Sequence, residues 1–432
     1  MKSRLRALFL DTLSELSLDV VMRERIRCDS GVLEVGGERV EIDSYKKVLV
    51  AAIGKAAGPM ARAFVRAVEP KRVSGVIVSS TETPDPPPYF LTYVGSHPYP
   101  DAGSIHAAEV ALGMLSDLAE HHLFVCLLSG GGSAIFEKPV DPSISTDDLR
   151  DFYRTLVTCG AGIVDMNVLR KHFSAVKGGR LAERAQPARQ MTLYVSDVPP
   201  GEPSTVASGP TMPDESTVDD CYRLVDKLGI RERLPQSIRR LLDERRVPET
   251  PKPGSDAFAS SSWHCLLDNQ AALEVIERRA REWGWAIETD LSVDDTPVAE
   301  AADSLLARLE RLKAAHPDKP AAVLTGGELS SPVTGDGRGG RNQAFVLDCV
   351  PKIAGRSVAV VSAGTDGIDG NSPAAGAVAD GETLARAVAL GMDPGEFYRR
   401  SDSFTFFERL GDALITGPSG NNVRDIRLLV AE

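Results

Sequence analysis

Apolar residues in the first half of the chain follow two different spacings. Continuous apolar runs of strand length alternate with segments in which apolar residues recur at helical spacing. The strand-like runs are residues 46–54, 73–80, 122–129 and 190–197, and the helical segments between them include residues 56–68 and 104–119. Such alternation predicts a parallel sheet that is covered by helices on both faces.

The same alternation resumes after residues 247–256 (VPETPKPGSD), which concentrate proline, glycine and charge without periodicity and are typical of a linker. The later strand-like runs are residues 261–268, 285–290, 321–327 and 357–364. With 432 residues, the chain also exceeds what one hydrophobic core usually organises. We therefore predict two α/β domains, residues 1–250 and 257–432, each with a mostly parallel sheet flanked by helices.

The composition narrows the class of protein. The chain has 61 acidic and 49 basic residues, a formal net charge of −12, and no long basic run, which argues against nucleic-acid binding. Its six cysteines stand far apart without a C-x-x-C pair, as expected of buried thiols in a reducing compartment. Asp11 and Glu15 interrupt the first apolar stretch too early for a signal peptide, and no run approaches the roughly 20 apolar residues of a membrane span. These features predict a soluble, cytoplasmic protein without a membrane partner.

The segment SGGGSA, residues 129–134, directly follows an apolar strand. Consecutive glycines let the backbone approach an anion closely, and ligands of open α/β sheets bind at the carboxyl ends of strands. The segment is therefore a candidate phosphate or carboxylate site, with a tight turn that only needs positive φ as the alternative. Neither a Walker A motif nor a G-x-G-x-x-G fingerprint occurs, so ATP would bind by another design.

Charged residues of the first domain supply further candidates. Lys55 lies at the start of a helix, where the helix dipole disfavours a cation, so it is a candidate to contact a carboxylate or a phosphate; a solvated lysine is the alternative. Asn167 and Arg170 lie on the polar side of a helical segment, which either lines a site or faces solvent. Asp197 ends a strand, where it could accept a hydroxyl proton, hold Mg²⁺ or only stabilise a turn.

Two blocks of the second domain combine glycines with charged residues. Residues 325–345 place Glu328, Arg338 and Arg341 in one strand-to-helix connection with six glycines, a pattern that favours anion binding by arginine. Asp366 and Asp369 follow the last strand-like run in TDGIDG. Their carboxylates could coordinate a divalent cation, or they could be two turn residues.

Seven blocks, taken in this order, resemble the glycerate 2-kinase family. They are AIGKAA, SGGGSA, NVLRKHFSAVKGGRLA, SDV…ASGPT, TGGE…GRGGRNQ, GTDGIDG and ITGPSGNNVRD. The resemblance extends from Lys46 to Asp425. It implies a larger, Rossmann-like N-terminal domain of the DUF4147 type, a smaller C-terminal domain of the MOFRL type, and an active site in the cleft between them.

The resemblance also implies an activity, the phosphorylation of D-glycerate to 2-phosphoglycerate with ATP and Mg²⁺, and it leaves a homodimer open. Matching positions imply Lys55, Asp197 and Arg341 as catalytic residues, and Asp366 and Asp197 as metal ligands. The implied substrate-binding and ATP-binding residues are Ser129, Gly130, Gly131, Gly132, Ser133, Asn167, Arg170, Lys177, Gly326, Glu328, Arg338, Asn342 and Thr365. In the mechanism that follows, Lys55 and Arg341 hold the substrate carboxylate and the transferring phosphate, and one of the two aspartates orients or deprotonates the 2-hydroxyl.

The chain departs from the family pattern at two loop positions. Ser372-Pro373 stands where the family has Thr-Asp, which excludes a metal ligand there, and Glu202 stands where an aspartate is expected.

Three rival functions remain. A hydroxypyruvate reductase would need the absent dinucleotide fingerprint, a kinase could act on another small hydroxy acid, and a binding-only sensor would not need a lysine, an arginine and carboxylates together.

Overall fold

The computed structural model of the protein describes residues 1–68, 73–199 and 201–432. The chain divides into two compact units, one formed by residues 18–266 and the other by residues 1–17 together with residues 267–432. We call them the central unit and the terminal unit and describe each by itself. The cleft that the sequence predicts between the two domains stays a prediction.

This division differs from the predicted limits of 1–250 and 257–432 in two places. The first helix, α1 (Lys2–Glu15), belongs to the terminal unit, where it contacts β12 and α11 and where Asp11 and Glu15 form ion pairs with Arg279. Residues 251–266 belong to the central unit, because the strand that follows the supposed linker joins the central sheet. An amphipathic helix or an edge strand packs on whichever apolar surface or sheet edge it fits, irrespective of its place in the chain.

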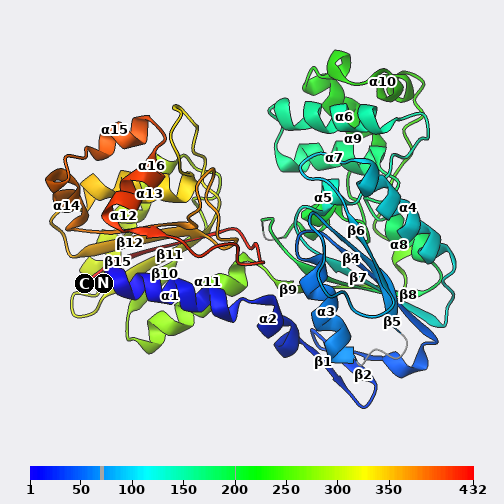
Figure 1. Ribbon diagram of the computed structural model, residues 1–432, viewed down its shortest axis with the longest axis horizontal. Helices are drawn as coiled ribbons and strands as arrows, with labels where there is room; N and C mark the ends of the chain where they lie inside the picture. Colours follow the sequence, from blue (N-terminus) through cyan, green and yellow to red (C-terminus); the bar gives the residue numbers. More distant parts are fainter. Residues whose placement is uncertain (69–72, 200) are drawn as a thin grey trace. The chain divides into compact units, whose positions relative to one another are not determined.

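The central unit is built on a six-stranded sheet with the order β6-β5-β4-β7-β8-β9 (Figure 1). Its strands are β4 (Lys47–Ile53), β5 (Val73–Ser79), β6 (Phe90–Val94), β7 (His122–Leu128), β8 (Arg189–Val195) and β9 (Ser261–Leu267). The pairs β4–β5, β4–β7, β5–β6 and β7–β8 are all parallel, as predicted. The predicted helices form as α3 (Ala57–Val68) and α4 (Ala102–Ser116).

Alternate residues of the central strands pack on opposite faces of the sheet, as the pleat requires. Leu49, Ala51 and Ile53 of β4 share one core with apolar residues of α4 and α8 (Arg180–Ala185), while α3 also packs on β4, β5 and β7. Uninterrupted burial along β4 and β7 explains why both strands are apolar at almost every position.

Four further helices enclose a second core of the central unit, in the upper right of Figure 1. They are α6 (Thr146–Thr158), α7 (Ile163–Phe173), α9 (Val218–Lys227) and α10 (Gln236–Asp243). The helical segment that carries Asn167 and Arg170 forms as α7, which ends at Phe173, and the next helix, α8, begins at Arg180. The unit begins with α2 (Leu18–Arg25) and an antiparallel meander that the apolar pattern did not predict, β1 (Ile26–Asp29), β2 (Val32–Val35) and β3 (Glu38–Glu41).

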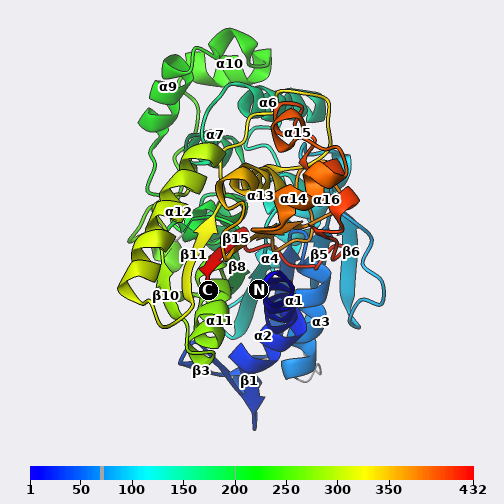
Figure 2. The ribbon, with the colours of Figure 1, turned by 90° about the vertical axis from the view of Figure 1, so that its left-hand side faces the viewer.

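The terminal unit contains a six-stranded sheet with the order β10-β11-β15-β12-β13-β14. Its strands are β10 (Ala286–Thr289), β11 (Ala321–Gly327), β12 (Val358–Gly364), β13 (Gly376–Asp380), β14 (Ala413–Leu414) and β15 (Asp425–Ala431). The helices are α1, α11 (Asn269–Glu282), α12 (Val298–Ala315), α13 (Arg341–Lys352), α14 (Thr383–Ala389), α15 (Pro394–Arg399) and α16 (Ser403–Leu410). Figures 1 and 2 both show the two chain ends close together on this unit.

The prediction of a mostly parallel sheet is wrong for the terminal unit. Among the strands that the structure describes in this sheet, only β10 and β11 pair in parallel, whereas β15 runs antiparallel to both β11 and β12, and β13 runs antiparallel to β12 and β14. The connection from β12 to β13, residues 365–375, is too short to contain the helix that a parallel crossover needs. A strand buried on both faces has the same apolar pattern in either direction, so the periodicity could not reveal this. None of the helices in the described residues is long and apolar enough to cross a membrane.

Candidate active site

The glycine loop of the central unit lies where β7 ends, beside the end of its parallel neighbour β4. Ser129 Oγ accepts a hydrogen bond from the Ala56 N–H over 3.1 Å, and the Gly130 carbonyl accepts one from the Lys55 N–H over 3.0 Å. These bonds connect the glycine loop to the β4–α3 turn, so the predicted residues Lys55 and Ser129 to Ser133 do lie together. The loop ends in a single helical turn, α5 (Gly132–Ile135), which Gly131 enters with a left-handed φ of 81°.

Lys55 and Asp197 lie against two successive glycines of this loop. A Cβ atom on Gly130 would stand 2.0 Å from Asp197 Oδ2, and one on Gly131 would stand 3.2 Å from Cγ and Cε of Lys55. The glycines are therefore needed for close packing of a cation stem and a carboxylate on the loop. Lys55 is exposed, and its ammonium has no ion-pair partner among the described residues.

A chain of hydrogen bonds joins the glycine loop to α7. Ser133 Oγ lies 2.8 Å from Ser208 Oγ, and Ser208 donates to Asn167 Oδ1 over 2.9 Å. Ala207 and Ser208 have left-handed φ values of 48° and 61°, which are uncommon for residues with a side chain and are found at functional sites where the surroundings hold them. The Ala207 Cβ lies 2.7 Å from where a Cβ on Gly132 would be, so this turn packs directly on the loop.

A buried ionic cluster supports the loop from behind. Glu137, 1% exposed, pairs with Lys177 over 2.6 Å and also accepts hydrogen bonds from Ser174 and Tyr153. Tyr153 Oη lies 2.7 Å from the Ser133 carbonyl oxygen. Burial lowers the pKa of Lys177, an effect that the charge of Glu137 opposes. The ammonium of Lys177, a predicted ligand-binding residue, is thus engaged inside the protein.

Arg170 lies beside this cluster, one helical turn from Asn167. It is 8% exposed, and the carbon of its guanidinium stands 5.1 Å from the centre of the Tyr153 ring. Its Nε is buried without an acceptor, and no hydrogen bond or ion pair joins the guanidinium to any residue that the structure describes. Partial burial, together with the positive charges of Lys55 and Arg170, lowers the pKa of His97.

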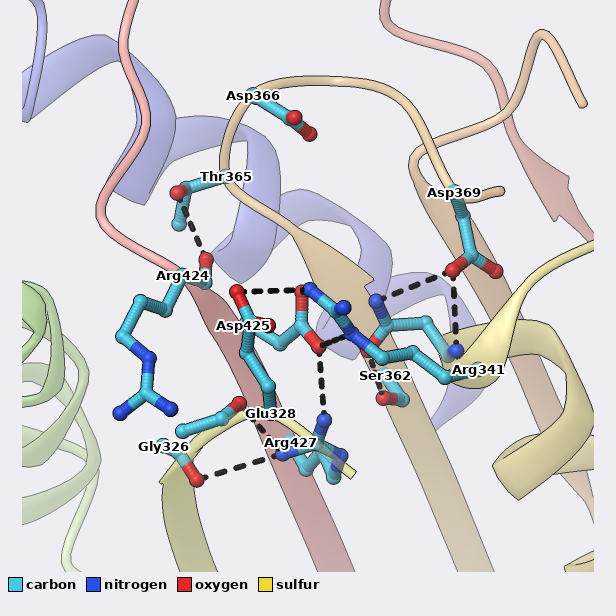
Figure 3. Close-up of polar contacts among 12 residues, drawn as sticks. Gly326, Glu328, Arg341, Ser362, Thr365, Asp366, Asp369, Arg424, Asp425 and Arg427 are labelled. Carbon is cyan, nitrogen blue, oxygen red and sulfur yellow. Dashed lines mark hydrogen bonds and ion pairs between the residues drawn. The ribbon is translucent and has the colours of Figure 1, made fainter. Parts of the chain in front are cut away.

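In the terminal unit, Arg341 begins α13 and is held by two carboxylates (Figure 3). Its Nε donates to Asp425 over 2.6 Å, and its Nη2 contacts Glu328 over 3.0 Å. Asp425 also accepts a bond of 2.9 Å from Arg427, which is fully buried and donates to the carbonyls of residues 326 and 327. The charges of these carboxylates raise the pKa of Arg341 despite its partial burial. Glu328 and Arg341 lie together as the sequence predicted, but Arg341 is already ion-paired.

Asp369 has a structural role at the start of α13. Its carboxylate accepts hydrogen bonds from the backbone N–H groups of Asn342 and Gln343 over 3.1 and 2.9 Å. Burial, reinforced by the charge of Asp425, raises the pKa of Asp369 to about 6. Asn342, a predicted ligand-binding residue, accepts a bond of 2.6 Å from Ser362. The carboxylate of Asp369 is thus engaged by the backbone of α13, and no group of three His, Cys, Asp or Glu side chains in the described chain could hold a metal ion.

The remaining predicted residues occupy different environments. Thr365 is buried and its hydroxyl donates to the Arg424 carbonyl over 2.8 Å, while Arg338 is exposed and stacks over Phe404. Gly326 leaves no room for a side chain, because a Cβ there would stand 1.7 Å from Asn269 Oδ1. Asp366 is half-buried and accepts a 3.0 Å bond from the Ile368 N–H. A pocket of about 620 Å³ is lined by Asp366, Arg341 and the glycine-rich segment that contains residues 337, 339 and 340.

Sequence reasoning missed several residues of these clusters. Asp425 and Arg427 are charged residues in an otherwise apolar strand, which was the one local signal of a buried ion pair. Glu137, Tyr153 and His97 left no such signal, because the contacts that matter connect distant segments.

Comparisons with known proteins agree with the fold and with the family that the sequence blocks resemble. Residues 4–243 match a family described as a domain of unknown function, DUF4147, and residues 321–425 match the MOFRL family. The chain is 34% identical over 422 residues to a D-glycerate 2-kinase of Thermotoga maritima, covering 96% of this chain and 98% of the relative. It is 36% identical over 395 residues to an Agrobacterium vitis protein named only as a candidate hydroxypyruvate reductase, covering 89% and 87%. The crystal structure of a Thermotoga maritima glycerate kinase superposes with a TM-score of 0.87 at 32% identity, covering 100% of this chain and 99% of the other.

Proposed function

The chain belongs to the family of two-domain glycerate 2-kinases that combine a DUF4147 domain with a MOFRL domain, and we propose that it transfers a phosphoryl group from ATP to the 2-hydroxyl of D-glycerate. The family membership supports the reaction class.

One observation carries the proposal. On the glycine loop at the carboxyl end of β7, an exposed lysine and a carboxylate lie against adjacent glycines. Phosphoryl transfer needs little covalent chemistry from a protein, but it needs positive charge near the transferring group and a group that orients the attacking hydroxyl. Lys55 and Asp197 would supply these two functions from two segments that lie against the same glycine loop.

We assign the transferring phosphate to Lys55. Its ammonium is a mobile point charge on an exposed stem, and no carboxylate of the described residues pairs with it. Asp197 orients the 2-hydroxyl of the acceptor and receives its proton as the new ester bond forms. The expected burial of both groups by bound substrate would strengthen these interactions, because electrostatic effects increase when water is excluded.

The pocket of about 620 Å³ in the terminal unit is our candidate for the nucleotide phosphates. Arg341 lines it, and the Nη1 of Arg341 has no partner among the described residues, so this atom can still donate to a phosphate oxygen. Asp425 and Glu328 then hold Arg341 in place and restrict how far it can move. This role is narrower than the predicted one, since a guanidinium held by two carboxylates retains few free donors.

The carboxylates of the chain suit Mg²⁺ that arrives with the nucleotide. Mg²⁺ commonly binds one or two protein carboxylates together with water and substrate phosphates, whereas a resident ion would need a larger ligand cluster. The described residues contain no cluster of that kind, and the candidate phosphate pocket is lined by the half-buried Asp366 and by Asp369, which is engaged at the start of α13. Asp366 would hold the ion, which would neutralise negative charge on the phosphate oxygens.

A coupled ADP-release assay with Mg·ATP and D-glycerate, followed by phosphorus NMR of the product, tests the reaction. We expect glycerate-dependent turnover and a new ester at the 2-position. The Lys55→Met variant should lose on the order of 10²-fold or more in kcat, because it removes the charge nearest the transferring group. Lys46→Met is the matched control, since Lys46 is exposed at the opposite end of the same strand. Near-normal turnover of Lys55→Met would remove Lys55 from the reaction.

An assay of NADH and NADPH oxidation with hydroxypyruvate tests the reductase activity that the name of the Agrobacterium relative suggests. The β4–α3 turn carries AIGKAAG in place of a dinucleotide fingerprint, so we expect no oxidation of NADH or NADPH by hydroxypyruvate. Turnover in that assay without ADP release in the first would replace the kinase with the reductase.

A further inference from the structure

Arg170 is a buried cation without a partner in the protein. Transferring a charged group from water into the interior is strongly unfavourable unless another charge or several hydrogen bonds compensate. Arg170 is 8% exposed, its Nε has no acceptor, and no carboxylate or carbonyl of the described residues accepts from its guanidinium. A buried polar group left in this condition requires an explanation, and a missing ligand is one.

Other buried or half-buried arginines of the chain have acceptors for their guanidinium groups, although the Nε of Arg427, like that of Arg170, is buried without a partner. Arg424 makes a bidentate ion pair with Asp294 at 2.7 and 2.8 Å. Arg427 is held by a carboxylate and two carbonyls, and Arg180 donates to four backbone carbonyls. The fold can therefore provide acceptors for a buried guanidinium, and it does not provide them for Arg170.

Tyr153 connects the guanidinium of Arg170 to the glycine loop. The Tyr153 ring covers it at 5.1 Å, and the Tyr153 hydroxyl is fixed between the Ser133 carbonyl and Glu137. Asn167, one turn earlier on α7, reaches the same loop residue through Ser208. A guanidinium carries its N–H groups in one plane, so it can donate to both oxygens of one acceptor group.

We propose that Arg170 binds the carboxylate of the acceptor acid, so that the central unit carries the subsite that selects a 2-hydroxy carboxylate. The proposal rests on the proposed kinase function and deepens it. The planar fork of a guanidinium matches the two oxygens of a carboxylate, while the compact and exposed ammonium of Lys55 suits the moving phosphoryl group. Arg341, which the sequence resemblance connected with the carboxylate or the phosphate, is already bound to two carboxylates and is not assigned to the acceptor.

His97 reports on this subsite. The positive charges of Lys55 and Arg170, added to burial, lower the pKa of His97. A carboxylate that binds Arg170 cancels part of that positive charge, so the pKa of His97 should rise towards its ordinary value. His97 is thus an internal probe of ligand binding that does not depend on turnover.

The first test compares Michaelis constants. In Arg170→Met we expect the KM for D-glycerate to rise on the order of 10- to 100-fold, the range for losing hydrogen bonds to a charged group, while the KM for Mg·ATP stays unchanged. Arg170→Lys should recover only part of the loss, because an ammonium cannot form the planar pair of bonds. Arg154→Met is the control, since Arg154 also stacks on an aromatic ring, that of Tyr99 at 5.5 Å, but is exposed and paired with Asp151.

Thermal unfolding separates binding from a structural role. Removing an unpaired buried charge relieves its desolvation, so Arg170→Met should unfold at the same temperature as the wild type or at a higher one. A lower unfolding temperature together with an unchanged KM for D-glycerate would show that Arg170 is structural. A rise in the KM for Mg·ATP alone would assign the guanidinium to a nucleotide phosphate and overturn the proposal.

The second test is an NMR titration of the histidine rings, of which the chain has seven. With the His97 signals assigned by a His97→Gln variant, we expect D-glycerate alone to raise the pKa of His97 in the wild type and to leave it unchanged in Arg170→Met. A response to Mg·ATP only, or to neither compound, would overturn the carboxylate subsite. This titration remains decisive if the wild type shows no turnover, a result that would refute the kinase but not by itself the subsite.

Discussion

The substitution Asp425→Asn removes one negative charge from the buried network of the terminal unit. Asp425 is 2% exposed and accepts bonds from Arg341 over 2.6 and 3.2 Å and from Arg427 over 2.9 Å. Asparagine keeps one oxygen, but its amide group would face guanidinium donors, and the fully buried Arg427 would have no carboxylate left. Breaking a buried ion pair by removing one partner destabilises a protein by about 3–5 kcal/mol. For a unit of this size each kcal/mol lowers the unfolding temperature by about 2–4 °C, which gives a decrease of about 6–20 °C.

Differential scanning calorimetry of the full chain measures this decrease. A protein of two units can unfold in two transitions, so the comparison applies to the transition that the substitution moves. Glu328→Gln is the matched control, because Glu328 contacts the same Arg341 over 3.0 Å while its side chain is 39% exposed. An exposed pair contributes about 0–1 kcal/mol, so this variant should unfold within a few degrees of the wild type.

We also expect a double variant to recover part of the lost unfolding temperature. Replacing both partners of a buried pair leaves no unpaired charge, so Asp425→Asn combined with Arg427→Met should unfold at a higher temperature than Asp425→Asn alone. If Asp425→Asn lowers the unfolding temperature no more than Glu328→Gln does, the buried carboxylate does not stabilise the unit and the argument from burial is refuted.

Two further predictions concern the glycine loop and the start of α13. Gly130→Ala should reduce glycerate-dependent turnover by about 10²-fold, because its methyl group would stand 2.0 Å from Asp197 Oδ2 and would displace that carboxylate. Gly113→Ala is the control and should retain full turnover, because there is open space around Gly113. Equal turnover rates in the two variants would contradict the assigned role of Asp197. Asp369 should titrate near pH 6 in carboxyl NMR, since burial and the charge of Asp425 raise its pKa to about 6. The stability that this raised pKa contributes is fully present below the unfolded pKa of about 3.9 and is lost as the pH rises through about 6. A titration midpoint of Asp369 near pH 4 would contradict the burial argument.

The fold could be predicted from the sequence where the apolar pattern is local and continuous. The runs that became β4, β7, β11 and β12 are buried at nearly every position, so their length and spacing were visible along the chain. The direction of a strand and the unit to which a helix belongs depend on distant partners. For this reason the pattern did not show that β15 enters the terminal sheet antiparallel or that α1 packs on the unit at the far end of the chain.

The candidate site could be predicted as a set of segments but not as a set of roles. The glycine loop brought Lys55 and Asp197 together as strand ends in a parallel sheet should. Lys177 and Asn342 also lie in blocks that resemble the family, yet Glu137 binds the ammonium of Lys177 and Ser362 donates to the amide oxygen of Asn342 inside the protein. Motif position indicates that a residue matters, while burial and hydrogen-bond partners indicate whether it serves the fold or a ligand.

Arg170 and Arg341 show how this distinction changes a mechanism. Both lie in motifs of the family, both are at least partly buried, and the sequence alone favoured Arg341 as the anion-binding residue. The structure provides Arg341 with two carboxylates and Arg170 with none. A cation that already has its counter-charges gains little from another anion, whereas a buried cation without one gains both the ion pair and relief from its own desolvation. We therefore expect a bound carboxylate to pair with Arg170 and not with Arg341, and we expect the acceptor to bind to the central unit before any phosphate is transferred.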